Sequence, residues 1–243
     1  MGEVQLPVGS AYRRCIESEV GNERSYYSRF ITPPPGVGQA NTLGIAMRRA
    51  SLGESKGACV TLAGPPGRIN HEYSTIAGVR ESVHDILMNL KEIVLATNLS
   101  AAQEAHIPII GPRKVVARDI VPPPSVKVTR PAQHVVTITR KIHLSTELRI
   151  ERGYGYRGRS MMEFQKGSFP LDAVSMPVQN ANYSIHRLES HGGGIMKEML
   201  LLEIRTNGSL APREAIYEAS RNSVNLSSPS PRNSLDESIY GKG

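Results

Sequence analysis

The stretch from Asn41 to Leu52 reads NTLGIAMRRASL, and this segment decides the fold. Its apolar side chains recur at spacings of three and four, which places them on one face of a helix: Leu43, Ala46, Met47 and Ala50. Asn41 or Thr42 is expected to cap that helix. Small residues at positions 44, 46 and 50 would let another helix approach closely. The segment is therefore predicted to pack against a second helix.

Two adjacent arginines, Arg48 and Arg49, project away from this apolar face. Such a pair is most often a solvated surface without a partner. The alternative is functional, because a helix that packs on one side can offer charge-assisted, bidentate contacts to an acidic partner on the other. The residues alone leave both interpretations open.

Outward from this helix, strands dominate both ends of the chain. Residues 15–32 are predicted to be strand-rich and end at three prolines, and residues 59–63 and 144–150 also have the pattern of strands. Residues 199–204 form another predicted strand, closed by Asn207-Gly208, and Pro212 then begins a helix over 213–222. Residues 154–166 are expected to form a surface loop, and residues 223–243 to be disordered.

A second amphipathic helix follows residues 71–75. Its apolar side chains recur at helical spacing: Val79, Val83, Ile86, Leu87, Leu90 and Val94. The order of the elements predicts the α+β class: strands and a helix come first, a mixed middle follows, and a strand and a closing helix end the chain. The first and last segments are expected to pair into one domain, with the middle inserted between them.

Composition excludes several classes of protein. The 243 residues carry a net charge of +7, 39% hydrophobic residues and two cysteines. No apolar run is long enough to span a bilayer, so no membrane partner is expected. The cysteines are too few for a disulfide framework or a zinc site. Residues 1–10 match no signal or transit peptide, which predicts a protein that works in the compartment where it is made.

Catalytic patterns are nearly absent. Gly36-Val37-Gly38 lacks the third glycine of a nucleotide-binding turn, and His71-Glu72 lacks the second histidine of a zinc protease. No cluster of carboxylates that could hold catalytic metals is visible. We therefore expect no catalytic residue, metal or cofactor in this chain. A hydrolase using His71 and Glu72 is the alternative enzyme hypothesis, although a structural role for His71 is favoured.

Residues 152–159 interleave arginines with Tyr154 and Tyr156. Single-stranded RNA binders use the same combination of cations and stacking rings. One short copy also fits a basic surface loop. A basic RNA-binding module is thus the competing hypothesis for function.

Five segments, in this order, resemble the N-terminal region of the α subunit of bacterial-type RNA polymerase, and most closely the plastid-encoded one. They are residues 38–49 (GQANTLGIAMRR), 71–79 (HEYSTIAGV), 89–95 (NLKEIVL), 172–178 (DAVSMPV) and 202–210 (LEIRTNGSL). Together they lie within about residues 12–222. Each segment is short, but five in the family's order are specific.

The resemblance implies an architecture and a set of partners. Residues 10–57 with 178–226 would form a dimerisation domain, and residues 58–177 an inserted strand-rich domain. A homodimer would recruit the β and β′ subunits (in plastids β, β′ and β″) and meet DNA only through the assembled enzyme, a nucleotidyltransferase of the plastid. A tail over 227–243 would take the place of the family's C-terminal DNA-binding domain.

The resemblance also assigns residues, in positions that match the family's motifs. The dimer interface would include the helix face named above together with Ile216 and Ala219. The contacts to β and β′ would be made by Arg48, Arg49, Leu52, Lys91, Leu171 and Asp172. Ser51 departs from the family's apolar pattern, as do Ser223, Asn225 and Ser227. These polar residues predict a weakened dimer or a degenerate α-like copy.

Overall fold

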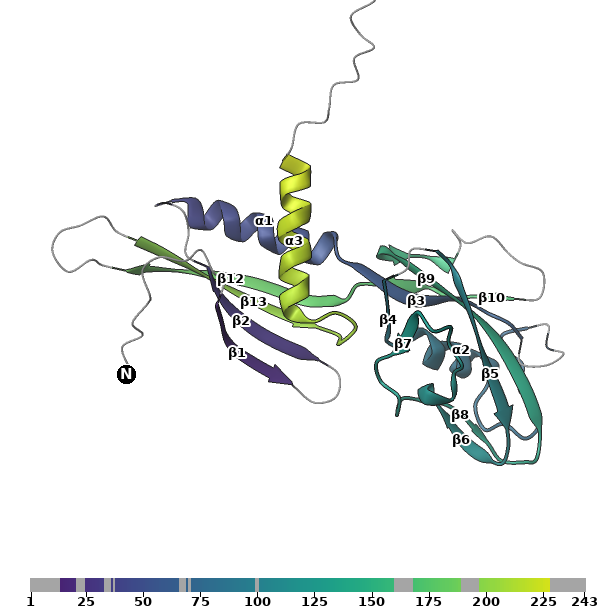
Figure 1. Ribbon diagram of the computed structural model, residues 1–243. Coiled ribbons are helices and arrows are strands. Elements are labelled where there is room, and N and C mark those ends of the chain that lie inside the picture. The colour runs from purple at the N-terminus through teal and green to yellow at the C-terminus, as the bar shows by residue number, and fades with distance from the viewer. Residues whose placement is uncertain are drawn as a thin grey trace, which may run out of the picture.

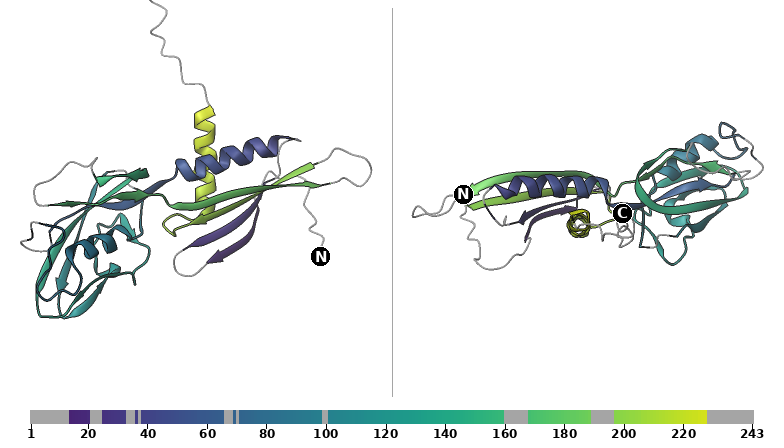
Figure 2. Two further views of the ribbon diagram at one scale, coloured as in Figure 1. Left: turned by 180° about the vertical axis from the view of Figure 1, so that it is seen from behind. Right: turned by 90° about the horizontal axis from the view of Figure 1, so that it is seen from above.

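The computed structural model describes residues 14–20, 25–32, 36, 38–65, 69, 71–98, 101–159, 168–188 and 197–227. Two bodies lie side by side in an elongated molecule, as Figures 1 and 2 show. One is built from both ends of the described chain and the other from its middle. The α+β class predicted from the sequence is confirmed.

The first body is centred on a four-stranded antiparallel sheet in the order β1-β2-β13-β12. Its strands are β1 (Arg14–Val20), β2 (Tyr26–Thr32), β12 (Val178–Leu188) and β13 (Lys197–Thr206). Phe30 of β2 lies opposite Leu202 of β13, so residues far apart in the chain are paired. Alternate residues of β2 are buried, as expected for a strand with one face in a core.

Two helices, α1 (Gln39–Gly53) and α3 (Pro212–Ser227), pack with this sheet. Figure 1 shows α1 along the sheet and α3 crossing it. Both contribute to one apolar core with the sheet: Phe30, Ala40, Met47, Ala50, Val178, Ala181, Leu200, Leu202, Ile204, Ala215, Ile216 and Ala219. Pro212 does begin the last helix, as predicted.

The start of α1 differs from the prediction. Asn41 and Thr42 lie inside the helix, and its N-cap is Gly38, at φ 83°. The Gly38 N–H donates to the carboxylate of Glu198 on β13 over 2.9 Å. Because that acceptor lies 160 residues away, a local capping rule does not find it. Asn41 instead accepts a hydrogen bond from the Tyr183 hydroxyl over 2.8 Å.

The second body holds the remaining strands around the short helix α2 (Val83–Lys91). Its main sheet has the order β11-β9-β3-β4-β7, and β10 pairs with β3 and β5 with β9. These strands are β3 (Lys56–Ala63), β4 (Leu95–Thr97), β5 (Gln103–Ile110), β7 (Val126–Val128), β9 (His143–Arg157), β10 (Phe169–Pro170) and β11 (Ala173–Ser175). The strands β6 (Arg113–Val116) and β8 (His134–Ile138) form a separate pair, and η1 (Ala117–Asp119) is a single 3₁₀ turn.

Helix α2 is shorter than the apolar spacing predicted. Val83, Ile86, Leu87 and Leu90 are its buried face, but Val79 makes an isolated bridge to Ile138 and Val94 precedes β4. Ser82 begins the helix with a capping box, because its side chain accepts from the Asp85 N–H and Asp85 accepts from the Ser82 N–H.

Two further predictions are wrong. The expected loop over 154–166 begins as strand, because β9 continues to Arg157 between β3 and β11. The expected disorder from 223 is also wrong for residues 223–227, which continue α3. Ser220 and Ser223 each donate to the carbonyl four residues earlier, so these hydroxyls are satisfied within the helix. Residues 160–167 and 228–243 lie outside the described part of the chain.

Ser51 is buried at 1% exposure, and its hydroxyl has no hydrogen-bond partner among the described residues. Ser51→Ala should therefore raise the free energy of unfolding by about 1 kcal/mol, because an unsatisfied buried polar group is removed. Ser55 is the matched control, since its hydroxyl donates to the Ser51 carbonyl over 2.9 Å. Ser55→Ala should lower stability in the same urea titration. A destabilised Ser51→Ala variant would contradict this account.

Candidate partner-binding sites

Helix α1 has a buried face and an exposed face. Gly44 is pressed against β12, where a Cβ atom would come within 2.4 Å of the Tyr183 ring. The small residue thus lets the helix approach the sheet of its own chain. The close approach to another helix expected at this position is replaced by contact with a strand.

The candidate dimer residues lie mostly inside the protomer. Met47, Ala50, Ile216 and Ala219 are each at most 3% exposed, because α1, α3 and the sheet of one chain meet there. The face that sequence analysis assigns to a second copy is therefore turned toward the chain's own core. Leu43 and Ala46 are half-buried, and their place in a dimer stays a prediction.

The opposite side of α1 carries a mixed apolar and cationic surface, which we call the outer face. It consists of Ile45, Arg48, Arg49 and Leu52, spaced as i, i+3, i+4 and i+7. Ile45 is 44% exposed and Leu52 37%. Neither arginine makes an ion pair or hydrogen bond within the described residues. Two unpaired guanidinium groups flanked by exposed aliphatic side chains suit an acidic protein partner.

Sequence analysis missed two residues that face outward. Ile45 lies on the outer face, and the same spacing rule applied to the second side of α1 would have found it. On α3, Tyr217 is 69% exposed next to the buried Ile216. A large exposed aromatic ring beside a rigid helix crossing is typical of a contact surface.

A second group of side chains, the Lys91 cluster, joins the candidate positions of the inserted body. Lys91 ends α2, and its Nζ lies 3.4 Å from an Asp172 carboxylate oxygen. The Arg159 N–H donates to the other Asp172 oxygen over 3.0 Å, and the Tyr156 hydroxyl also interacts with the Asp172 carboxylate. Arg159 in turn pairs with Glu72 at 2.8 Å. Leu171, which precedes Asp172 in the chain, is buried, and its N–H donates to the Thr61 carbonyl over 2.9 Å.

The cluster shifts the titration of its members. The Arg159 N–H lowers the pKa of Asp172 most; partial burial opposes this, and Lys91 and Tyr156 add to the lowering. The interaction with Asp172 raises the pKa of Tyr156, because loss of the Tyr156 proton would place two anions together. These contacts therefore favour the ionised carboxylate of Asp172 and the protonated hydroxyl of Tyr156.

Asp172 is therefore expected to titrate below its ordinary pKa of 3.8. Since the folded-state pKa is the lower one, its contribution to stability is present above 3.8 and is lost as the pH falls through the folded value. A carbon-detected NMR titration of the side-chain carboxyl should show this midpoint. Lys91→Met should raise the midpoint without restoring the ordinary value. A midpoint at or above 3.8 in the parent chain would contradict the assignment.

His71 and Glu72 are each engaged by other groups. The Nδ1 atom of exposed His71 accepts from the Tyr73 N–H over 3.2 Å, and Glu72 is occupied by Arg159. This is the structural role favoured for the histidine. Gly36 and Gly38 flank position 37, which lies outside the described residues.

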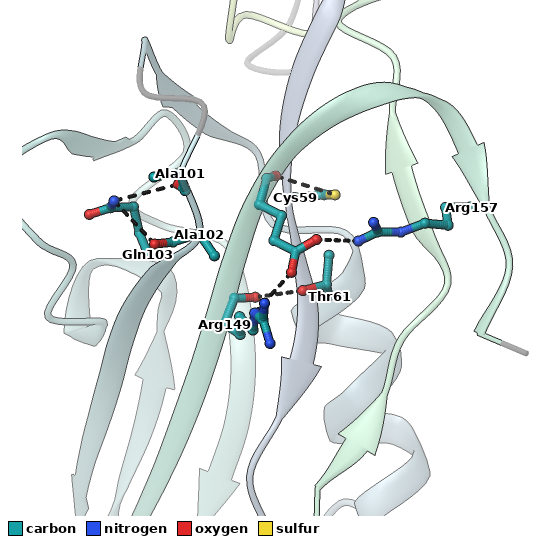
Figure 3. Close-up of polar contacts among 8 residues, drawn as sticks. Cys59, Thr61, Ala101, Ala102, Gln103, Arg149 and Arg157 are labelled. Atoms are coloured by element: carbon teal, nitrogen blue, oxygen red, sulfur yellow. Dashed lines mark hydrogen bonds and ion pairs between the residues drawn. The ribbon is translucent and has the colours of Figure 1, made fainter. Parts of the chain in front are cut away.

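The arginines of residues 152–159 are all engaged by carboxylates. Arg157 and Arg149 both pair with the Glu151 carboxylate, and Arg149 lies 2.9 Å from it. Figure 3 shows Arg149 and Arg157, which lie in the first and last parts of the long strand β9, both pointing toward Glu151. Arg152 lies 3.7 Å from Glu218, and Lys56 stacks over the Tyr154 ring at 4.9 Å. Cations already paired in this way are poor ligands for phosphates, which disfavours the RNA-binding hypothesis.

The two bodies meet around a small cavity of about 320 Å³. Lys56, Arg152 and Thr97 line it from the middle of the chain, and Glu214 and Glu218 line it from α3. Beside it, Arg130 donates to the Asn207 carbonyl over 3.0 Å. Opposite charges thus face each other across the junction, where Arg152 pairs with Glu218.

Within the described residues, no three His, Cys, Asp or Glu side chains lie together so as to hold a metal ion. None of the described helices is long and apolar enough to cross a membrane. Neither finding tests the expectation that the chain uses no cofactor, which stays a prediction.

The fold defines a class: a two-body α+β chain in which a strand-rich body is inserted between the halves of a sheet-and-helix body. Residues 57–175 match the family model of the RNA polymerase Rpb3/RpoA insert domain. Three plant proteins named DNA-directed RNA polymerase subunit alpha are also similar. The protein of Huperzia lucidula is 58% identical over 91% of this chain and 66% of its own length. Those of Ceratophyllum demersum and Chloranthus spicatus are 52% and 50% identical over 93% of this chain, and 66% and 67% of their own lengths.

The chain belongs to the family of α subunits of DNA-directed RNA polymerase. It spans about two thirds of the length of the curated relatives it matches. The resemblance found in the five sequence segments is thereby confirmed.

Proposed function

We propose that this chain is a non-catalytic assembly subunit of a plastid DNA-directed RNA polymerase. It forms a homodimer, captures the β subunit and then the β′ subunits, and contributes no residue or cofactor to nucleotidyl transfer. Its relatives are plant proteins that carry the α-subunit name, which supports the plastid assignment.

The outer face of α1 carries this proposal. Its two arginines are exposed and lack partners among the described residues, whereas the arginines of residues 149–159 are nearly all engaged by carboxylates. A charged group kept free on a helix that is fixed by a sheet and by α3 is preorganised for a partner. We assign capture of β to this face, with Arg49 and Leu52 at its centre.

The Lys91 cluster supports the second assembly step. Lys91, Asp172 and Arg159 come from different segments of the inserted body and converge at one surface. Because the cluster is internally paired, it presents a fixed pattern of charge rather than a free cation. We assign contact with β′ to this surface.

The experiment is co-purification from cells that express the tagged chain with β alone, with β′ alone and with both. The proposal expects β to copurify without β′, and β′ to copurify only when β is present. Capture of β′ in the absence of β would overturn the assembly order. Failure to capture either subunit would overturn the function.

A further inference from the structure

The end of the inserted body that lies farthest from α1 and α3 carries a concentration of positive charge, which we call the basic tip. It lies at the lower end of the body in Figure 1, where β5, β6, β8 and β9 turn. Its members are Arg80, Arg113, Lys114, Arg140, Lys141 and His143, all exposed.

Backbone contacts bring these residues together from three segments. The Gly111 N–H donates to the Ile142 carbonyl over 3.0 Å, which joins the turn after β5 to the turn before β9. The Thr139 N–H donates to the Gly78 carbonyl over 2.8 Å, and the Arg80 N–H to the Thr137 carbonyl over 3.0 Å. Lys114 lies opposite Thr137 across the β6–β8 pair. The tip is therefore a fixed arrangement of charge.

Most of this charge is not neutralised. Residues 78–80, 110–114 and 139–143 include no aspartate or glutamate. Of the nearest carboxylates, Asp119 pairs with Arg113 at 3.2 Å, and Glu81 accepts from the Thr137 N–H over 2.7 Å and lies 2.9 Å from His134. Arg80, Lys114, Arg140 and Lys141 make no side-chain ion pair or hydrogen bond within the described residues. This contrasts with the paired arginines of residues 149–159.

We propose that the basic tip binds the phosphate backbone of double-stranded DNA. The described residues of the tip include no Phe, Tyr or Trp ring on which bases could stack, which disfavours single strands. Protein interfaces are depleted in lysine and rich in aromatic residues at their centre, which disfavours a protein partner. Four free cations on a rigid turn pair instead fit phosphate contacts, which carry affinity without sequence specificity.

The choice of DNA rests on the proposed function, because an assembled polymerase holds duplex DNA close to its subunits. The chain would then contact DNA itself, and not only through the other subunits. This contact is tested on the full chain alone, so its failure would leave the assembly role standing.

The test measures binding of a short fluorescent DNA duplex by anisotropy across a salt series. Lys114→Gln/Arg140→Gln/Lys141→Gln is compared with Lys127→Gln/Arg205→Gln/Arg213→Gln, which removes the same charge from exposed positions elsewhere. At about 50 mM salt the tip variant should bind roughly tenfold more weakly than the control, and the slope of log affinity against log salt should shrink by about 3. Circular dichroism should show both variants folded.

Four outcomes would overturn the proposal. Equal losses of DNA affinity in the two variants would mean that only net charge matters. Absence of DNA binding by the parent chain would mean that the basic tip is not a DNA site. If the tip variant lost affinity for polyglutamate but kept its affinity for DNA, the surface would belong to an acidic protein. A preference for duplex RNA over DNA would also contradict it.

Discussion

Arg49→Ala is expected to abolish capture of the β subunit while leaving the fold and the homodimer intact. Arg49 is exposed on α1 and has no partner within the described residues, so its removal takes nothing from the protomer. In the complex, the Arg49 guanidinium would pair with a carboxylate of β. Truncation of Arg49 would leave that carboxylate without its partner. That costs about 2–5 kcal/mol, which is roughly 30-fold or more in Kd.

The measurement is a titration of purified β against the immobilised chain, with unfolding curves recorded in parallel. Arg213→Ala is the matched control, because Arg213 is an exposed arginine at the start of α3, away from the outer face. It should bind β as the parent does. Undiminished capture by Arg49→Ala would refute the assigned role of the outer face.

Ile216→Ala and Tyr217→Ala should separate folding from dimerisation at neighbouring positions. Ile216 is 3% exposed and packs in the core shared by α1, α3 and the sheet. Its truncation should lower the free energy of unfolding by about 2–5 kcal/mol. Tyr217 is 69% exposed, so its truncation should leave the protomer's stability within about 0.5 kcal/mol and weaken the dimer instead.

Urea unfolding followed by circular dichroism at two protein concentrations distinguishes the two effects. The loss in Ile216→Ala should be the same at both concentrations, whereas the effect of Tyr217→Ala should depend on concentration because dimers stabilise by mass action. If the loss of stability depended on protein concentration only in Ile216→Ala, Ile216 would be assigned to the dimer interface.

Much of the fold follows from the sequence. Apolar spacing finds α1 and the buried face of α2, strand-rich and apolar runs find β2, β3 and β13, and alternation finds the first half of β9. Pro212 marks the start of α3. These features depend on residues near one another in the chain, so local patterns are sufficient to predict them.

Features that depend on distant partners could not be predicted in the same way. The N-cap of α1 rests on Glu198, and the second half of β9 is strand because Lys56 lies opposite Tyr154 and Ala173 opposite Arg157. Without those neighbours, the glycines and arginines of this segment resemble a loop. Likewise, in the sequence the apolar side of α1 fits any partner helix, and only the structure shows that the sheet and α3 of the same chain cover it.

The candidate sites also differ in whether they depend on residues near one another in the chain or on distant ones. Arg48 and Arg49 were identifiable by chemistry and spacing, whereas the Lys91 cluster requires α2 and the segment before β11 to meet. The basic tip also escapes a linear scan, since its cations are spread over three short segments joined only by backbone hydrogen bonds.

Sedimentation of the purified chain at micromolar concentration tests the proposed homodimer. We expect a particle of twice the 26.5 kDa of one chain, which shifts to a larger complex when β is added. A particle that keeps the mass of a single chain and ignores β would contradict it.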